Sequence, residues 1–201
     1  MIYNNDDNKE KEKLLNEKYD EIIKSIDNVI LNNIKNTYSF FIVLNNYRVS
    51  QKIKFSEKLF DLIAYIFNKA QDLLLKSDDQ KLSKLLLVLS QTYYKEINGT
   101  KKYIISVIKY HQLFKNKEFW KNSLIMDIEE QLKINSGFSK DKKDDIINMK
   151  NILYVNTMRE FDVPVDIILE VINEICNEYE CNQEVRISSL SFLNINNKIN
   201  T

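Results

Sequence analysis

Apolar side chains recur at three- and four-residue steps along most of this 201-residue chain. That spacing places them on one face of an α-helix and leaves the opposite face to polar residues. The first such pattern begins near Lys9 and either stops near Asn32-Asn33 or continues through Ser39. The segment 37–44, TYSFFIVL, favours a buried helix because a lone strand would have no partner, and a loop is expected at 45–54.

The middle of the chain carries clear helix boundaries. Ser56 is a good N-cap, and residues 77–79, SDD, offer a stop followed by a new cap. The helix after them has an apolar centre, LLLVL, which is typical of a helix buried in the middle of a bundle. At residues 98–100, NGT, the glycine is expected to close one helix and the threonine to cap the next, which ends near His111.

Three further helical segments follow. A helix from about Asn116 is expected to bury several large apolar residues, and Pro164 lies in the first turn of a later helix. The helix between them, opened by Ser139, is expected to direct these residues inward: Ile146, Met149, Leu153, Asn156 and Met158. After Cys181 the pattern fades, so only a short docked element is expected there.

The counts of glycine and proline decide the fold class. The chain has two Gly and one Pro, where average usage predicts roughly 14 and about 10. Strand-rich folds need turn glycines, and phosphate-binding loops need several. The sequence therefore predicts an all-α fold, a single compact helical bundle of about seven helices. Residues 9–193 are expected to form the bundle domain, residues 1–8 a disordered lead and residues 194–201 a disordered tail.

The charge balance and the apolar segments limit which partners and which cellular location are expected. Lys+Arg and Asp+Glu both number 29, so no basic excess favours nucleic acid as a partner. The N-terminal stretch lacks the apolar region of a secretory signal, and no apolar run approaches the length of a transmembrane segment. A cytoplasmic protein is expected. The two cysteines, Cys176 and Cys181, would lie roughly 140° apart on one helix, and Cys176 is expected to be a buried thiol.

The residue types of a reaction centre are sparse. His111 is the single histidine, and its position suits the C-terminal end of a helix better than catalysis. No Cys-x-x-Cys or paired-histidine spacing predicts a metal site, and no motif predicts a cofactor. The chain is therefore expected not to be an enzyme. The alternative is an enzyme whose site uses only Glu, Asp, Tyr and Lys, which a deep polar cleft with strongly shifted carboxylates would support.

Two aromatic dipeptides, Tyr93-Tyr94 and Phe119-Trp120, suggest a binding surface. Neighbouring residues on a helix point in different directions, so only one ring of each pair is expected to face the core. Exposed aromatic residues are enriched in protein interfaces. The predicted protein-binding surface comprises Tyr94, Tyr103, His111, Phe119 and Trp120. The alternative is that these rings fill crevices between helices.

The same region carries a family resemblance. The sequence LLLVLSQTYYKEINGTKKYIISVIKYHQLFKNKEFW resembles the helical domain of SET-binding factor 2, which occurs in myotubularin-related pseudophosphatases, and a related form occurs in small cytoplasmic proteins. Downstream, REFDVPVDIILEVINEICNEY is similar to a segment of the same domain, so the resemblance spans about residues 82 to 180. Phe114 stands where the family often has Trp, and Asp162 where it often has Gly.

The resemblance implies a helical scaffold in membrane traffic or signalling, without enzyme activity. The leading hypothesis is a non-catalytic interaction module that binds another protein. The second is an effector or accessory subunit of a small GTPase or of its exchange factor, whose binding would depend on the bound nucleotide.

Overall fold

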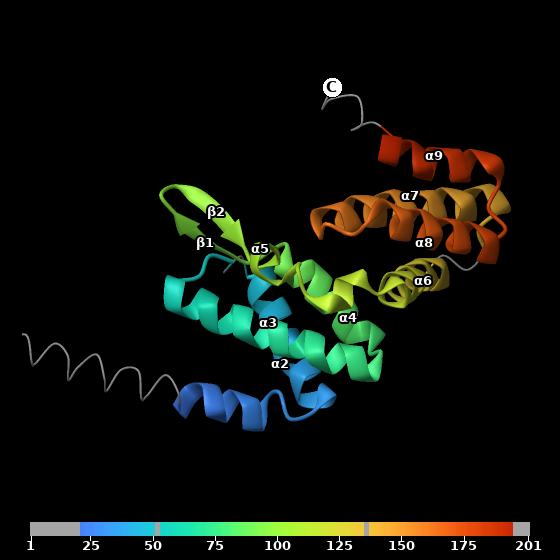
Figure 1. The fold of residues 1–201 in the computed structure, drawn as a ribbon. Helices are drawn as coiled ribbons and strands as arrows, with labels where there is room; N and C mark the ends of the chain where they lie inside the picture. Colours follow the sequence, from blue (N-terminus) through green and yellow to red (C-terminus); the bar gives the residue numbers. More distant parts are fainter. Residues whose placement is uncertain (1–20, 51–52, 135–136, 195–201) are drawn as a thin grey trace, which may run out of the picture.

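A computed structural model describes residues 21–50, 53–134 and 137–194 of the chain (Figure 1). Residues 21–29 are helical. The longer elements after them are α2 (Ile34–Val49), α3 (Glu57–Ser77), α4 (Gln80–Ser90), α6 (Lys117–Ile134), α7 (Lys140–Glu160), α8 (Val165–Glu178) and α9 (Gln183–Asn194). The described part is thus mostly helical, as predicted. The proposed lead 1–8 lies outside the described residues, as does the proposed tail beyond Asn194, which ends α9.

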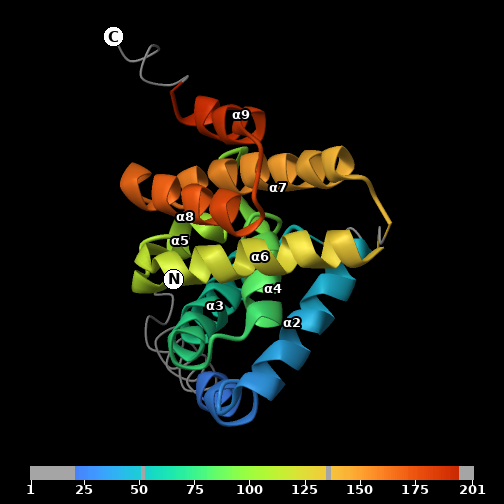
Figure 2. The ribbon, with the colours of Figure 1, turned by 90° about the vertical axis from the view of Figure 1, so that its right-hand side faces the viewer.

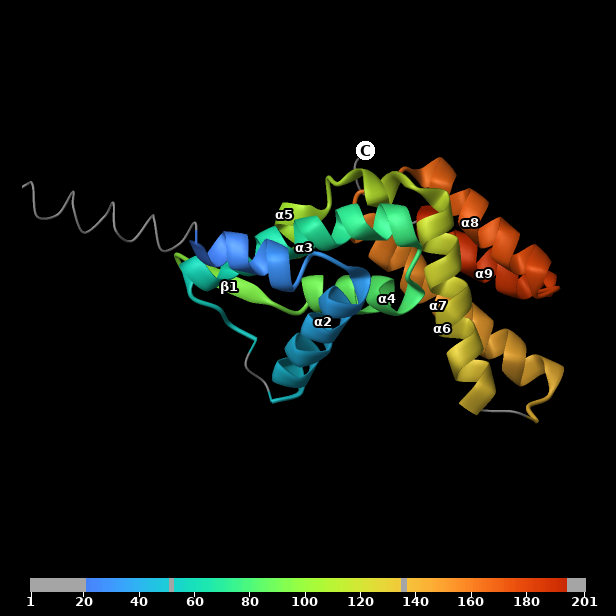
Figure 3. The ribbon, with the colours of Figure 1, turned by 90° about the horizontal axis from the view of Figure 1, so that it is seen from below.

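The helices pack in two groups on either side of α6. Helices α2, α3 and α4 contact one another in the first group, and α7, α8 and α9 do so in the second. Helix α6 packs against α4 on one side and against α7 and α8 on the other, and Figures 2 and 3 show it crossing between the groups. The buried apolar side chains of both groups belong to one hydrophobic cluster, which Leu86, Trp120 and Ile172 help to fill.

The first helical pattern is interrupted before α2, which begins at Ile34. Asn33 is the N-cap, and its side-chain oxygen accepts a hydrogen bond of 2.9 Å from the backbone N–H of Asn36. The apolar segment 37–44 is a helix, as predicted, with Phe41 and Leu44 buried. The expected loop at 45–54 is wrong over its first half, because α2 continues to Val49.

Residues 94–103 form a β-hairpin, which contradicts the expectation of helices throughout. Strand β1 (Tyr94–Ile97) pairs antiparallel with β2 (Thr100–Tyr103), and Ile53 and Phe55 exchange backbone hydrogen bonds with Tyr94 on the other edge of β1. The turn residues Asn98 and Gly99 have φ of 51° and 78°. A two-residue turn with both φ positive matches the twist of paired strands, and Asn-Gly is its preferred sequence. The glycine that was expected to separate two helices therefore joins two strands.

The segment after the hairpin is shorter and less regular than predicted. Helix α5 (Ile105–Ile108) makes a single turn, and η1 (Gln112–Lys115) is a 3₁₀ helix. His111 does not end a helix but caps η1, where its Nδ1 accepts a hydrogen bond of 3.2 Å from the backbone N–H of Leu113. Val107, within α5, is exposed over 37% of its surface.

Helix α7 presents a different face to the core from the one predicted. Of the residues expected to face inward, Met158 is buried, but Met149 and Leu153 are 54% and 51% exposed, and Ile147 and Val155 are buried instead. The sequence of α7 has apolar residues on two faces, so its periodicity alone permits either orientation. Packing against α6 and α9 selects the face that includes Ile147 and Val155.

Helices α7 and α8 end in the same way. Asp162 and Glu180 follow them with φ of 54° and 49°, in the left-handed region. Beyond each, a backbone N–H reaches back to a carbonyl five residues earlier, from Val163 to Met158 and from Cys181 to Cys176, both at 2.9 Å. This is the Schellman pattern, in which the two outer side chains meet. Asp162 thus adopts the conformation that a glycine would favour at this turn.

Glycine at Glu180 is expected to stabilise the protein. The left-handed conformation costs a residue with a Cβ roughly 1–2 kcal/mol, whereas glycine loses roughly 0.4–1 kcal/mol of unfolded-state entropy. Glu180→Gly should therefore raise the free energy of unfolding by about 0.5–1 kcal/mol in urea denaturation. Glu180→Ala removes the same carboxylate but keeps the Cβ, so it should leave stability nearly unchanged. Equal effects of the two substitutions would contradict the left-handed strain.

Candidate functional site

One face of the hairpin presents an aromatic and charged surface to solvent. Tyr94 is paired with Tyr103 and Glu96 with Lys101, so the four side chains share a face of the sheet. The two tyrosine rings lie 5.5 Å apart between centroids, and Lys101 Nζ lies 4.7 Å from the centroid of the Tyr94 ring. Both tyrosines are half-buried, whereas Glu96 and Lys101 are exposed. We call these four residues the hairpin face.

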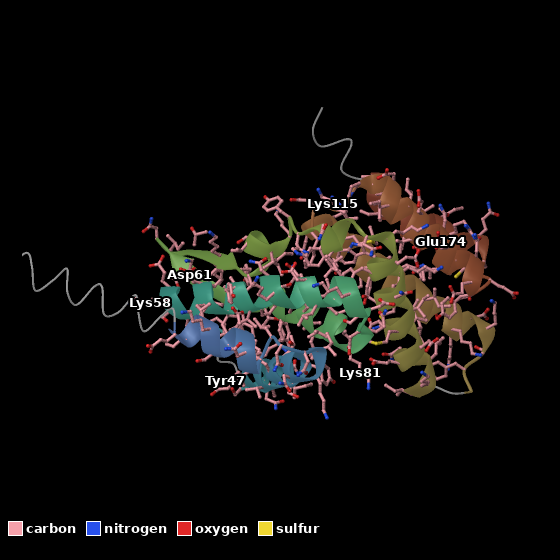
Figure 4. All side chains as sticks on the ribbon, turned by 60° about the horizontal axis from the view of Figure 1, so that its bottom comes forward. Tyr47, Lys58, Asp61, Lys81, Lys115 and Glu174 are labelled. Carbon is pink, nitrogen blue, oxygen red and sulfur yellow. The ribbon has the colours of Figure 1, made fainter. Side chains whose placement is uncertain are left out.

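The opposite face of the hairpin is fixed to the N-terminal end of α3. Lys95 is 7% exposed, and its Nζ lies 3.0 Å from Asp61 Oδ1, 3.4 Å from Glu57 Oε1 and 4.9 Å from the centroid of the Phe60 ring. Figure 4 shows Asp61 on α3 beside the strands. The hydrogen bond to Asp61 raises the pKa of Lys95, which stays charged at neutral pH. The hairpin therefore projects as an anchored element, as Figure 1 shows.

A surface ion pair links Lys54, which lies beside β1, to the hairpin. Lys54 Nζ and Glu96 Oε2 are 2.7 Å apart. The hydrogen bond from Lys54 lowers the pKa of the Glu96 carboxyl. Both side chains are exposed, so this pair contributes little stability and mainly sets the local charge pattern.

His111 lies apart from the hairpin face. Its Nε2 is 3.2 Å from Asp72 Oδ1 on α3, and its side chain is 18% exposed. Asp72 follows Asp61 by eleven residues on the same helix, a rise of about 16 Å. The structure therefore does not bring His111 together with Tyr94 and Tyr103.

Phe119 and Trp120 are both in the core, so the expectation that only one ring faces inward is wrong and the alternative, that both rings fill crevices between helices, is confirmed. Phe119 is 4% exposed and Trp120 is fully buried. The indole Nε1–H donates a hydrogen bond of 2.8 Å to the carbonyl oxygen of Phe114. In this conformation neither ring can reach a partner. Of the predicted surface, Tyr94, Tyr103 and His111 remain accessible, and their role in binding stays a prediction.

A cleft that the sequence did not indicate lies beside α4, α6 and α7. It has a volume of about 410 Å³, and its lining includes Lys84, Val88, Asp127, Leu153 and Tyr154. Asp127 Oδ1 is 2.7 Å from Lys84 Nζ, and Asp127 Oδ2 is 2.7 Å from Lys150 Nζ. Lys84 also pairs with Glu130 at 2.5 Å. The three helices are thus joined by a chain of ion pairs.

The charges in this cleft favour a structural role over a catalytic one. Burial alone would raise the pKa of Asp127, but hydrogen bonds from Lys150 and Lys84 outweigh it and hold that pKa below its usual range. A general base needs a pKa near the working pH, which these two lysines prevent. Sequence periodicity could not reveal the cluster, because Lys84, Asp127 and Lys150 come from three separate helices.

No helix among the described residues combines the length and apolar character needed to cross a bilayer. Within the same ranges, no three His, Cys, Asp or Glu side chains come together in a way that could hold a metal ion.

The described residues define a mostly helical protein with a projecting hairpin. The chain belongs to the SBF2 family, whose model, described as "Myotubularin protein", matches residues 12–191. This match confirms the resemblance seen in the sequence. A relative, myotubularin-related protein 5 of Caenorhabditis elegans, is 26% identical over 91 residues. That match covers 45% of this chain but 5% of the length of the relative. No solved structure matches the chain.

Proposed function

We propose that this chain is a non-catalytic, cytoplasmic interaction module that binds another protein through the hairpin face. The observation that carries the proposal is the Tyr94–Tyr103 pair, which faces solvent on an element that projects from the helices. Tyrosine supplies a large contact area at a low cost in conformational entropy, and it is enriched where partners bind most strongly.

The rigidity of the hairpin supports the proposal. The Lys95 contacts with α3 and the backbone hydrogen bonds from residues 53–55 hold the strands in place before any partner arrives. A preorganised surface avoids the entropy loss of ordering a loop on binding. Membership of the myotubularin-related family supports a scaffold role in membrane traffic or signalling.

Removal of both hairpin rings is expected to abolish partner binding. In affinity purification from the native cell, Tyr94→Ala/Tyr103→Ala should recover the specific partners at less than about a tenth of the wild-type level, because interface tyrosines often contribute 2 kcal/mol or more. Recovery is measured by quantitative mass spectrometry. Retention of the same partners by the folded double variant would contradict the proposal.

Tyr110 supplies the matched control. It is 70% exposed and lies outside the hairpin, so Tyr110→Ala removes an equally large ring without touching the hairpin face. This variant should keep every partner. Lys101→Glu keeps both tyrosines and reverses one charge on the hairpin face, so reduced binding by this variant, with its folding verified by circular dichroism, would locate the contact on that face.

The same purification separates the two candidate roles. If the partner is a small GTPase, its recovery should differ between lysates loaded with GDP and with a non-hydrolysable GTP analogue. A partner of a generic scaffold should be recovered equally in both. The family resemblance motivates the role as a partner of a small GTPase, and the hairpin face is compatible with either role.

A further inference from the structure

A buried polar cluster lies where α7, α8 and α9 meet. Asn151 and Ser189 are fully buried, and Cys176 is 1% exposed. The side-chain amide of Asn151 donates to Cys176 Sγ at 3.6 Å and to Ser189 Oγ at 3.3 Å. These three polar side chains lie in an otherwise apolar junction between helices. They are not part of the hairpin face.

The end of α8 brings the second cysteine back to this cluster. The backbone N–H of Cys181 donates to the carbonyl oxygen of Cys176 at 2.9 Å, across the left-handed residue Glu180. In this motif the two outer side chains are in contact. The Cys181 thiol accordingly makes a hydrogen bond with the Cys176 thiol. The expected separation of roughly 140° is therefore wrong, because α8 ends at Glu178 and Cys181 is not on the helix.

The surroundings of the pair favour a thiolate at the buried sulfur. The hydrogen bond from Cys181, the nearby Arg186 guanidinium and the Asn151 amide together outweigh burial and lower the pKa of Cys176 to about 7. The shared proton correspondingly raises the pKa of Cys181, which is half-buried and so open to small molecules. Redox-active cysteines combine thiolate character with exposure and often stand next to a second cysteine. Here the two properties are divided between neighbouring residues, with the thiolate at Cys176 and the exposure at Cys181.

We propose that Cys176 and Cys181 form a dithiol modification site that reacts with a low-molecular-weight disulfide, such as oxidised glutathione, to give an intramolecular disulfide. The Cys176 thiolate acts as the base, and it accepts the Cys181 proton across their hydrogen bond as Cys181 Sγ attacks the glutathione disulfide. One glutathione thiolate leaves, and a mixed disulfide remains on Cys181. Cys176 then gives its proton to the first glutathione thiolate. The Cys176 thiolate attacks Cys181 Sγ, which forms the intramolecular disulfide and displaces the second glutathione. The two protein sulfurs are oxidised, and both halves of the glutathione disulfide are reduced.

The position of the site explains what the bond would constrain. Cys176 belongs to α8, and Cys181 precedes α9, whose Val185 is buried. A disulfide requires neighbouring Cα atoms, and the backbone hydrogen bond between the two residues already holds them close. A disulfide between them would fix the connection between α8 and α9.

Mass spectrometry of the full chain tests the proposal. The reduced protein is incubated with excess oxidised glutathione and denatured in N-ethylmaleimide, and its intact mass is then measured. The expected product lacks two hydrogens and carries neither maleimide nor glutathione, and dithiothreitol restores two maleimide adducts. Two maleimides before reduction, a stable glutathione adduct or a disulfide-linked dimer on a non-reducing gel would each overturn the proposal.

Two single variants test the order of the steps. Cys176→Ser, with its folding verified by circular dichroism, should stop at one glutathione on Cys181, because the displacing thiol is missing. Cys181→Ser should take up no glutathione, because its remaining thiol is buried. Glutathione on Cys176 in the folded Cys181→Ser protein would overturn the assignment of Cys181 as the entry point.

Discussion

Replacement of Trp120 by alanine is expected to lower the free energy of unfolding by about 3–5 kcal/mol. The indole is fully buried, and its ring centroid lies 5.2 Å from that of Phe119, 5.4 Å from that of Phe161 and 5.8 Å from that of Phe114. Its removal leaves a cavity among these rings and deprives the Phe114 carbonyl of its hydrogen bond. Since typical domains are stable by about 5–15 kcal/mol, much of the population of a marginal variant would unfold.

The measurement is urea denaturation followed by far-ultraviolet circular dichroism, because Trp120 is the single tryptophan and fluorescence is lost with it. Trp120→Phe is the matched control. It keeps an aromatic ring in the cluster and should cost about 1–3 kcal/mol, less than alanine. A folded Trp120→Ala protein with wild-type stability would show that this ring is not a core residue.

Replacement of Asp127 by alanine is expected to destabilise the protein by about 3–5 kcal/mol. The side chains of Asp127 and Lys150 are 10% and 14% exposed, so the substitution leaves a largely buried ammonium group without its counter-ion. Lys84 is less affected, because Glu130 remains beside it. Removing one partner of a buried pair costs more than the pair itself contributes, since the remaining charge stays desolvated.

A double variant separates the unpaired charge from lost packing. Asp127→Leu/Lys150→Met replaces both members of the pair by apolar side chains and should recover most of the stability that Asp127→Ala loses. Chemical denaturation of the wild type, Asp127→Ala and the double variant at neutral pH gives the comparison. If the double variant is no more stable than Asp127→Ala, the loss comes from packing and the electrostatic explanation fails.

The same carboxylate should make stability depend on pH. The pKa of Asp127 is lowered in the folded protein, whereas an unfolded Asp has a pKa of about 3.9. The unfolded state therefore binds its proton first as pH falls, and the contribution of Asp127 is present above about pH 4 and lost as pH falls through the lower folded pKa. The stability difference between wild type and Asp127→Asn should accordingly shrink below about pH 4. A difference independent of pH would contradict the ion pair.

Helix ends were the features most readable from local sequence. Ser56 and the aspartate at 79 cap their helices as predicted, since a side-chain oxygen three residues before a backbone N–H is a local arrangement. The sequence Asn98-Gly99 was equally local but ambiguous, because a left-handed glycine can end a helix or turn a hairpin. The backbone contacts with residues 53–55, distant in sequence, distinguish the two.

The candidate site depended far more on tertiary contacts. Tyr94 and Tyr103 were singled out as aromatic residues, but their shared face follows from the strand pairing. His111 instead contacts Asp72 of α3 and lies away from the two tyrosines. The Asp127 cluster and the Cys176–Cys181 contact carried no sequence signal, because spacing along a chain does not show where separate helices meet or where one helix ends and turns back.

The amino-acid sequence by itself determined that this protein is mostly helical, where most of its helices begin, and which family it belongs to. Those properties depend on residue type and short-range spacing. Only the tertiary structure decided which face of α7 is buried, that both Phe119 and Trp120 are core, and that a hairpin projects from the helices. Each of these depends on which surfaces of distant elements can be buried against one another, and that is a property of the whole chain.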